Sequence, residues 1–409
     1  MKIETSKWNK FLVFIDPILF NNGMMFLSLT TTIPYFLLKF NASNIHISIA
    51  NLLPNLGSLI PVLFFANYAQ RLSRKGKAFT NMLLIQRVSF LIYVLLIPYL
   101  TNFGDRTNIY LFLTFWGIFS FFVGSYGPFY FSILDAVIPY EERGNILGFA
   151  YSVSNLLSLI SSWVLGIYLA HFSFPHNFTY IFLTGILILI IDAFLFRLIR
   201  EPENPNTPSN SVLSFTELIT YAKDLLINNE NFRNLMISFV LLFFATTTLP
   251  YHLVFITKTF ETTSSIVSQM ALISASINIL GSLLFGRISK RFGNRIVLML
   301  GNIMAIIGIG LNFIWGSLSA AIICYALVTS LFNAYMLTGG LLVTNIAKRE
   351  SLPFYISVNT IVTTIFSSLL YLVNAKIMDF WGFKILILLG FLGSLGSFLI
   401  LWRKMKGVK

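Results

Sequence analysis

Three charged residues, Asp16, Arg87 and Asp192, interrupt long apolar stretches of the sequence. An ionised side chain in an apolar medium is costly, so it either pairs with an opposite charge or takes part in moving protons or ions. Asp16 and Arg87 lie at similar depths in their stretches and can pair, while Asp192 can approach Arg87 or extend toward Arg197. Two interpretations stay open. Asp16 carries a coupling proton or contacts a cation, or these residues form a structural ion pair that holds helices together.

Polar residues also recur along one face of the first apolar stretch. The helical spacing i, i+4, i+7 and i+11 places four residues on one stripe, namely Asn21, Met25, Ser28 and Thr32. At about 100° per residue, Asp16 lies roughly 140° away from this stripe. We therefore expect the stripe, and not Asp16, to form the wall of a substrate cavity. The alternative for each serine or threonine is a hydrogen bond to a carbonyl of its own helix.

Metal and nucleotide chemistry have no matching motif in the sequence. Cys324 is the only cysteine, which excludes an intrachain disulfide. Together with the four histidines it gives no metal-site spacing. The phosphate-binding pattern G-x-x-x-x-G-K-[ST] does not occur, which argues against direct ATP-driven pumping. We expect no metal, no cofactor and no enzymatic activity.

The composition indicates that the elements carrying these residues lie in a membrane. Of the 409 residues, 56% are hydrophobic and 11% are charged, whereas soluble domains carry about 25% charged residues. A soluble fold could not cover so much apolar surface. The net charge of +13 does not indicate nucleic acid, because the basic residues sit in short loops between apolar runs. The sequence therefore predicts an integral membrane protein whose surroundings are the lipid bilayer.

Twelve apolar runs are long enough to span a bilayer, which takes about 20 residues. Backbone groups in lipid must bond within their own segment, so we expect helices. The alternating pattern of a transmembrane barrel is absent. We interpret the first run as a retained span. The runs lie near 11–38, 46–66, 78–100, 108–133, 145–170, 178–199, 234–256, 265–286, 296–315, 318–345, 353–375 and 382–402.

A polar gap divides the twelve runs into six and six. It predicts an N-terminal bundle at 1–200, a cytoplasmic linker at 201–233 and a C-terminal bundle at 234–409. The linker opens with "EPENPNTPSNS", whose composition is typical of a loop. The following "SFTELITYAKDLL" is either a short amphipathic helix at the membrane surface or a plain tether.

Lysine and arginine are distributed unevenly between alternate loops. With the N-terminus inside, the cytoplasmic segments hold 22 of the 28 basic residues and the outer segments hold five, while one lies within a span. Cytoplasmic loops of membrane proteins are enriched in basic residues. We therefore expect both termini in the cytoplasm and a multi-pass protein of the cytoplasmic membrane.

The two halves repeat short sequences in the same order. "TTTIPYFLL" at Thr30–Leu38 corresponds to "TTTLPYHLV" at Thr246–Val254, an offset of 216. The basic segment "ANYAQRLSRK" from Ala66 corresponds to "GRISKRFGNR" from Gly286, an offset of 220. The shared order indicates duplication, and transporters with parallel six-helix repeats bind their substrate between the halves.

These basic segments resemble a motif of the major facilitator superfamily (MFS). The family's loop between spans two and three carries Gly-x-x-x-Asp-Arg/Lys-x-Gly-Arg/Lys-Arg/Lys, and its loop between spans eight and nine often repeats it. The second copy matches here at Gly286, Arg291, Gly293 and Arg295. The first copy keeps only the basic positions Arg71, Arg74 and Lys75. The acidic position is lost in both copies, where Gln70 and Lys290 stand instead.

The resemblance implies a fold and a set of gates. The fold is an all-α membrane protein with twelve transmembrane helices in two six-helix bundles related by a pseudo-two-fold repeat. The segment "IPYEERGNILG", which contains Arg143, also looks like the family's loop between spans four and five. In the family such basic loops gate the inner side, so the motif residues and Arg143 are gating candidates. The alternative is that these arginines only follow the general enrichment of basic residues in cytoplasmic loops.

The resemblance further implies that spans one and seven line the substrate cavity. Thr248 and His252 in the seventh run are therefore substrate-binding candidates. Asn333 and Tyr335 in the tenth run are further candidates. His252 replaces Phe36 of the first repeat, so its alternative role is that of a hydrogen-bonded packing residue.

The function expected from these features is a permease for a small solute, working by alternating access and coupled to an ion such as a proton. A cavity of aromatic, amide and hydroxyl groups favours export of a small, mostly apolar compound. One alternative is an uptake symporter for a neutral solute. The other, from a different class, is a non-transporting membrane sensor or scaffold.

Overall fold

Every ordered element of the described chain is a helix. A computed structural model describes residues 7–202, 223–260, 265–347 and 352–405, and no strand occurs among them. The chain divides into two compact units. Unit 1 comprises Met1–Asn210 and Val267–Ala275, and unit 2 comprises Ser211–Ile266 and Ser276–Lys409. The sequence boundaries of the two bundles stay a prediction, and most of the predicted linker, including most of its expected surface helix, lies outside the described residues.

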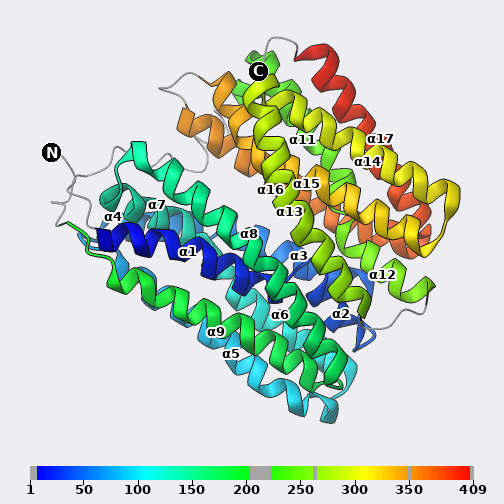
Figure 1. The fold of residues 1–409 in the computed structure, drawn as a ribbon, viewed down its shortest axis with the longest axis horizontal. Coiled ribbons are helices and arrows are strands. Elements are labelled where there is room, and N and C mark those ends of the chain that lie inside the picture. The colour runs from blue at the N-terminus through cyan, green and yellow to red at the C-terminus, as the bar shows by residue number, and fades with distance from the viewer. Residues whose placement is uncertain (1–6, 203–222, 261–264, 348–351, 406–409) are drawn as a thin grey trace. The chain divides into compact units, whose positions relative to one another are not determined.

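Unit 1 holds the first six predicted spans, and three of them are interrupted (Figure 1). The helices are α1 (Lys7–Phe26), α2 (Thr32–Leu38), α3 (Asn44–Leu59), α4 (Val62–Gln70), α5 (Gly76–Leu96), η1 (Ile97–Asn102), α6 (Asp105–Phe121), η2 (Phe122–Ser125), α7 (Tyr126–Val137), α8 (Tyr140–His171) and α9 (His176–Leu198). The interruptions fall between α1 and α2, between α3 and α4, and at the 3₁₀ turn η2.

Unit 2 holds the other six predicted spans, except for Val267–Ala275 of the eighth, which belong to unit 1. The seventh predicted span is interrupted. A short helix at 223–228 comes first. The spans are α11 (Glu230–Thr246), α12 (Leu249–Thr259), α13 (Ser265–Phe292), α14 (Asn294–Trp315), α15 (Leu318–Ile346), α16 (Leu352–Phe380) and α17 (Gly382–Lys404).

Ten helical segments of the described chain are long and apolar enough to cross a membrane. They correspond to the third through twelfth predicted spans. The first two predicted spans are the ones that break into α1 with α2 and α3 with α4, so neither is one long helix. The continuous first span assumed from the sequence is therefore wrong between Phe26 and Thr32.

The internal sequence repeat coincides with a helix break in both units. Thr30–Leu38 contains the start of α2, and Thr246–Val254 contains the start of α12. Pro34 and Pro250 each lie in the first turn of the new helix, where a missing N–H removes no helical hydrogen bond. The repeated Thr-Thr-Thr-x-Pro thus marks the same local geometry twice.

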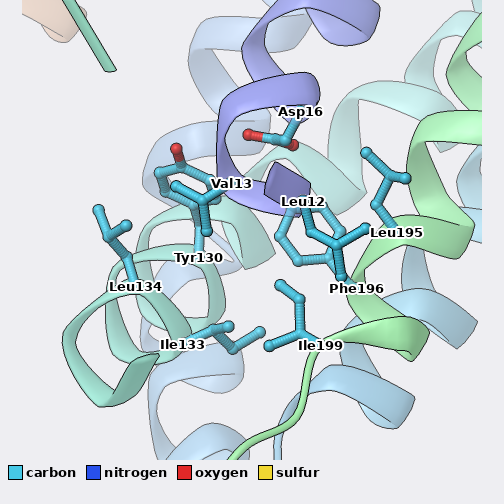
Figure 2. Close-up of a pocket in the computed structure, with 9 residues that line it drawn as sticks. All are labelled: Leu12, Val13, Asp16, Tyr130, Ile133, Leu134, Leu195, Phe196 and Ile199. Carbon is cyan, nitrogen blue, oxygen red and sulfur yellow. The ribbon is translucent and has the colours of Figure 1, made fainter. Parts of the chain in front are cut away.

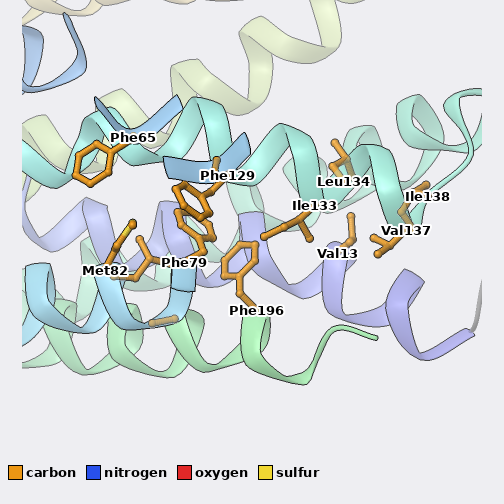
Figure 3. Close-up of a cluster of buried hydrophobic side chains, with 13 residues drawn as sticks. Val13, Phe65, Phe79, Met82, Phe129, Ile133, Leu134, Val137, Ile138 and Phe196 are labelled. Atoms are coloured by element: carbon orange, nitrogen blue, oxygen red, sulfur yellow. The ribbon is translucent and has the colours of Figure 1, made fainter. Parts of the chain in front are cut away.

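Aromatic and aliphatic side chains fill the interior of unit 1 at the end that holds the helix α5 N-terminus. Figure 3 shows this cluster, in which Phe79 of α5 stacks on Phe129 of α7 and meets Phe196 of α9 edge to face. Val13 of α1 belongs to the same buried cluster. The cluster fixes α1, α5, α7 and α9 against one another, and these helices carry the charged residues identified from the sequence.

Candidate functional site

The three charged residues of the apolar stretches meet inside unit 1. Arg87 on α5 and Asp192 on α9 form an ion pair, with Nη2 and Oδ2 2.7 Å apart. Both side chains are 1% exposed, and Asp16 on α1 is 8% exposed. Of the pairings that the sequence left open for Arg87, the structure has the one with Asp192.

Asp16 lies against this ion pair. Its carboxyl group is close enough to Asp192, Tyr130 and Arg87 to interact with each of them electrostatically, and all four residues line one cavity. Two neighbouring carboxyl groups can hydrogen-bond to each other only if one of them holds a proton, because an ionised carboxylate only accepts. The arrangement therefore brings two acidic groups and one basic group together in a buried site.

A pair of glycines explains why α1 and α9 approach closely enough for this contact. A Cβ on Gly185 would lie 2.8 Å from Cβ of Phe26 and 2.9 Å from the Gly23 carbonyl. A Cβ on Gly23 would lie 2.7 Å from the Leu189 side chain. Gly23 follows Asp16 by seven residues, and Gly185 precedes Asp192 by seven. The two helices thus cross about two turns from the carboxyl groups.

A cavity of about 210 Å³ opens beside the charged residues. Its polar lining consists of Asp16, Asn21, Arg87, Asp192 and the tyrosines Tyr126, Tyr130 and Tyr151. The rest of its wall is mainly phenylalanine, contributed by Phe20, Phe79, Phe131 and Phe196. All of these residues belong to unit 1. The cavity therefore combines a buried charge cluster with an aromatic wall.

A second, much smaller space lies on the other side of Asp16. Figure 2 shows Asp16 and Tyr130 above it, with Leu12, Leu134 and Ile199 among the apolar residues that close it. Its volume is about 10 Å³, which is no more than about one water molecule needs. Asp16 and Tyr130 thus separate a roomy cavity from a tightly packed apolar region.

The polar stripe predicted along the first span is not continuous. Asn21 lines the cavity together with Asp16, so the expectation that these two residues face different surroundings is wrong. Five residues cover about 7.5 Å of helix, and one cavity of this size follows α1 over that length. Met25 and Ser28 are half-buried, and Ser28 contacts Thr30. Thr32 lies beyond the helix break and is buried in α2.

The candidates of the seventh run lie in the interior of unit 2. The Thr248 hydroxyl donates to the Ala245 carbonyl at 2.6 Å, which is the own-helix alternative. His252 is fully buried, and its Nδ1 donates to the Thr248 carbonyl at 3.1 Å. Its Nε2 lies 3.4 Å from Cys324 Sγ, and its ring meets Phe383 edge to face. His252 thus has the surroundings of a packing residue.

The candidates of the tenth run also have partners within unit 2. Asn333 Nδ2 donates to Asn278 Oδ1 at 3.0 Å, while Asn333 Oδ1 is buried without a hydrogen-bond partner. The Tyr335 ring meets Phe239 and Phe243 edge to face, each at 5.1 Å between centroids. Of the eight residues predicted to bind substrate, Asn21 alone lines either of the two cavities described above.

The first basic loop has an acidic partner that the sequence did not reveal. Arg71 and Arg74 are exposed, whereas the backbone N–H groups of Lys75 and Gly76 donate to the Glu201 carboxylate at 2.5–3.1 Å. Glu201 therefore places an anion at the N-terminus of α5, where the helix dipole favours it. The motif has its acid at the position that Gln70 occupies here. Glu201 lies 125 positions after Gly76, so a search confined to the loop could not find it.

Arg143 is held by its own segment. Its Nε donates to the Ile138 carbonyl at 3.0 Å, and its Nη2 lies 2.6 Å from Asp135 Oδ1. The Asp135 side chain is 75% exposed. These contacts close the turn between α7 and α8.

The second basic segment is mostly helical, which corrects the prediction that it forms a loop from Gly286 onward. Gly286 lies inside α13, and a Cβ there would meet nothing within 4 Å, so the loop glycine expected at this position is wrong. Gly293 is the residue between α13 and α14, with φ of 90°, a conformation that favours glycine. Arg291 lies in the last turn of α13, and Arg295 of α14 donates from Nη1 to the Met405 carbonyl at 2.6 Å.

Comparisons with known proteins place this geometry in a family context. A model of the Major Facilitator Superfamily matches residues 17–260 and 235–408 of the chain. A search of curated proteins found no match.

Solved transporters share the fold at low sequence identity. The nucleoside transporter NupG is 14% identical with a TM-score of 0.70, covering 97% of this chain and 98% of that chain. A D-xylose–proton symporter is 15% identical with a TM-score of 0.67, covering 96% of both chains. A bacterial homolog of the human lysosomal transporter Spinster is 14% identical with a TM-score of 0.65, covering 97% of this chain and 95% of that chain. At such identities the likeness concerns the fold alone.

Proposed function

Because the chain belongs to the Major Facilitator Superfamily, we propose that it is a permease that moves a small solute across the cytoplasmic membrane by alternating access. The family match and the helical structure confirm the expected all-α membrane fold, in which ten helical segments are long and apolar enough to span a bilayer. The proposed permease has twelve helices in two six-helix bundles. The observation that carries the proposal is the cavity of about 210 Å³ beside Asp16, Arg87 and Asp192. In this proposal both termini lie in the cytoplasm, as the distribution of basic residues favours.

Coupling to a proton is the second part of the proposal, and Asp16 carries it. Arg87 can neutralise one of the two neighbouring carboxylates, and its bond to Asp192 assigns it to that one. A second buried carboxylate without a cation would be costly, and a bound proton removes its charge. Asp16 lies beside Asp192, Arg87 and Tyr130 and lines the cavity. A solute bound in the cavity therefore changes the affinity of Asp16 for a proton.

The cavity wall supports export of a small, mostly apolar compound. Phenylalanine and tyrosine make up seven of its fourteen lining residues, and Asn21 adds one amide. The alternative within the same class is an uptake symporter for a neutral solute. Accumulation by energised cells, compared with efflux from preloaded cells, distinguishes the two directions.

The experiment that tests transport begins with a ligand screen. Purified protein in detergent is heated with a broad compound panel, because ligands that bind the folded form raise its apparent stability. Hits are then tested for flux in proteoliposomes under an imposed pH gradient, with wild type and Asp16→Asn side by side. The exposed residue Asp224 provides the matched control Asp224→Asn.

The expected result is flux in wild type and Asp224→Asn that follows the pH gradient, with a loss of about 100-fold in Asp16→Asn, within the usual range for a proton-transfer residue. Unchanged proton-driven flux in Asp16→Asn would remove this residue from the coupling mechanism. Binding of hits without flux under any gradient would instead favour the non-transporting sensor or scaffold.

A further inference from the structure

The cavity of unit 1 has one acidic group more than its ion pair requires. Its lining contains two carboxyl groups, Asp16 and Asp192, and one basic side chain, Arg87. Arg87 and Asp192 are joined at 2.7 Å and together carry no net charge. The remaining ionisable groups of the lining are three tyrosines, which are neutral near pH 7. With both carboxyls ionised, the lining therefore carries a net charge of about −1, located at Asp16.

Aromatic rings surround this excess charge. Phe20 meets Tyr126 edge to face at 5.6 Å, and Tyr130 meets Phe131 in the same way at 5.4 Å. Tyr151 lines the same cavity as Asp16. Ring faces carry partial negative charge and attract cations, most strongly where water is excluded. The wall and Asp16 thus favour the same sign of ligand charge.

In the described ranges no Lys or Arg side chain lies over the face of these rings, and Arg87, which lines the same cavity, is paired with Asp192. The cation–ring contacts found in the described ranges involve Tyr35, Tyr110, Phe292 and Trp402, which lie elsewhere. The cavity of about 210 Å³ exceeds the roughly 150 Å³ of an engineered cavity that holds benzene. There is therefore space for a small organic ion with an apolar body.

We infer that this cavity binds a monovalent organic cation, an ammonium group joined to a small apolar body, with Asp16 as its counter-ion. This inference rests on the proposed transport function and names its substrate class. An anion could reach Nε and Nη1 of Arg87, which have no hydrogen-bond partner, but it would have to sit beside two carboxyl groups. A neutral solute brings no charge and leaves the Asp16 proton in place, so only a cation can take the place of that proton at the carboxylate.

A consequence follows for coupling. The proton and the ammonium group compete for Asp16, because each alone neutralises the same carboxylate. Binding of the cation then releases one proton, and exchange of the two across the membrane moves no net charge. Tyr130 lines both spaces together with Asp16 and can offer its hydroxyl to the carboxyl group.

The test compares three probes of one shape and different charge. These are 2-phenylethylammonium, 2-phenylethanol and phenylacetate, titrated calorimetrically into the purified full-length protein at pH 7. The expected result is that the ammonium binds at least tenfold more tightly than the alcohol and that phenylacetate does not bind. Buffers of different ionisation enthalpy are expected to report the release of about one proton per ammonium bound.

Variants locate the binding to the cavity. Asp16→Asn is expected to abolish the preference for the ammonium, Asp16→Glu to keep it, and Asp224→Asn to leave all three affinities unchanged. Equal binding of alcohol and ammonium by wild type, or tighter binding of phenylacetate, would overturn the inference even if no variant folds. An ammonium preference that survives in folded Asp16→Asn would overturn it as well.

The same experiment separates this inference from the proposed function. Ammonium binding that depends on Asp16, without flux in proteoliposomes, supports the cation site and contradicts the transport proposal. Proton-driven flux of a neutral or anionic compound, with no ammonium binding, contradicts the cation site and supports the transport proposal.

Discussion

Arg87 and Asp192 lie 105 positions apart in the sequence, yet their side chains meet at 2.7 Å with 1% of each exposed. Arg87 Nε and Nη1 and Asp192 Oδ1 have no hydrogen-bond partner. The pair is thus buried but incompletely satisfied. Such a pair costs little to replace as a whole and much to break, because a single substitution leaves one charge uncompensated.

This asymmetry gives a stability prediction. Arg87→Met leaves two carboxyl groups without a cation and is expected to lower the stability of the folded protein by about 3–5 kcal/mol. Asp192→Leu is expected to lower it by less, because Asp16 remains beside Arg87. The double variant is expected to recover a large part of that loss, since no unpaired charge remains at this pair. Thermal unfolding in detergent, followed by tryptophan fluorescence, measures the cycle.

The exposed pair Arg143 and Asp135 provides the control for that cycle. Its N–O distance is 2.6 Å, similar to that of the buried pair, but the Asp135 side chain is 75% exposed. Breaking it is expected to cost less than about 1 kcal/mol. Additive losses in the buried double variant, or equal losses at the two pairs, would contradict the role assigned to burial.

The glycine contact between α1 and α9 makes a second prediction. Gly185→Ala adds a Cβ that would lie 2.8 Å from the Phe26 side chain and 2.9 Å from the Gly23 carbonyl. The helices must then separate, at an expected cost of about 1–3 kcal/mol. Because Asp16 and Asp192 lie two turns away on the same helices, the variant is also expected to weaken proton-coupled flux.

Gly148→Ala serves as the comparison for Gly185→Ala. A Cβ at Gly148, inside α8, meets nothing within 4 Å. Replacing glycine in a helix stabilises it by about 0.5–1 kcal/mol when space is free. If Gly185→Ala were as stable as Gly148→Ala, the close crossing of α1 and α9 would be ruled out.

Much of the fold follows from local patterns in the sequence. Apolar run length predicts the spans from the third to the twelfth, because lipid demands long helices and the runs meet that demand locally. Run length does not reveal the breaks after Phe26 and after Leu59, since the residues there remain apolar or small. The repeated proline at Pro34 and Pro250 was a usable signal for two of the breaks.

The site was harder to predict because it depends on contacts between distant residues. The charges at Asp16, Arg87 and Asp192 could be identified one by one, since each is costly in an apolar run. Their pairing depends on how α1, α5 and α9 pack, which periodicity within one helix does not contain. Glu201 was missed for the same reason, because its partners Lys75 and Gly76 are backbone N–H groups.

Glu201 carries a third prediction. Glu201→Ala removes the carboxylate that accepts from the N–H groups of Lys75 and Gly76. Loss of such an acceptor at a helix N-terminus is expected to cost about 0.5–2 kcal/mol. Amide hydrogen exchange of the first turn of α5 is expected to accelerate, and mass spectrometry of peptides from this turn measures it.

Asp224→Ala is the comparison for that variant. Asp224 is exposed and accepts only from Asn228, four residues along. Its removal is expected to leave exchange in α5 unchanged. Slow exchange retained at Lys75 and Gly76 in Glu201→Ala would argue that another group caps this helix.

The two glycines of the second basic segment give a fourth prediction with opposite signs. Gly293 has φ of 90°, so Gly293→Ala is expected to destabilise the protein by about 1–2 kcal/mol. Gly286 lies within α13 with free space around it, so Gly286→Ala is expected to stabilise it by about 0.5–1 kcal/mol. Melting temperatures of the two variants check the signs. A large loss of flux in a stable Gly286→Ala protein would restore the gating role suggested by the motif.

His252 and Phe36 occupy equivalent positions of the internal repeat, and both are fully buried among aromatic rings. His252→Phe keeps a ring against Phe383 and loses only the contacts to the Thr248 carbonyl and the Cys324 thiol. We expect the free energy of unfolding of this variant to lie within about 1.5 kcal/mol of the wild-type value. His252→Ala leaves a cavity and is expected to lower the free energy of unfolding by about 2–5 kcal/mol. Flux of a ligand found in the screen is expected to be unchanged in His252→Phe, because the contacts of the ring are those of a packing residue. A folded His252→Phe protein with a raised KM for that ligand would return His252 to the substrate site.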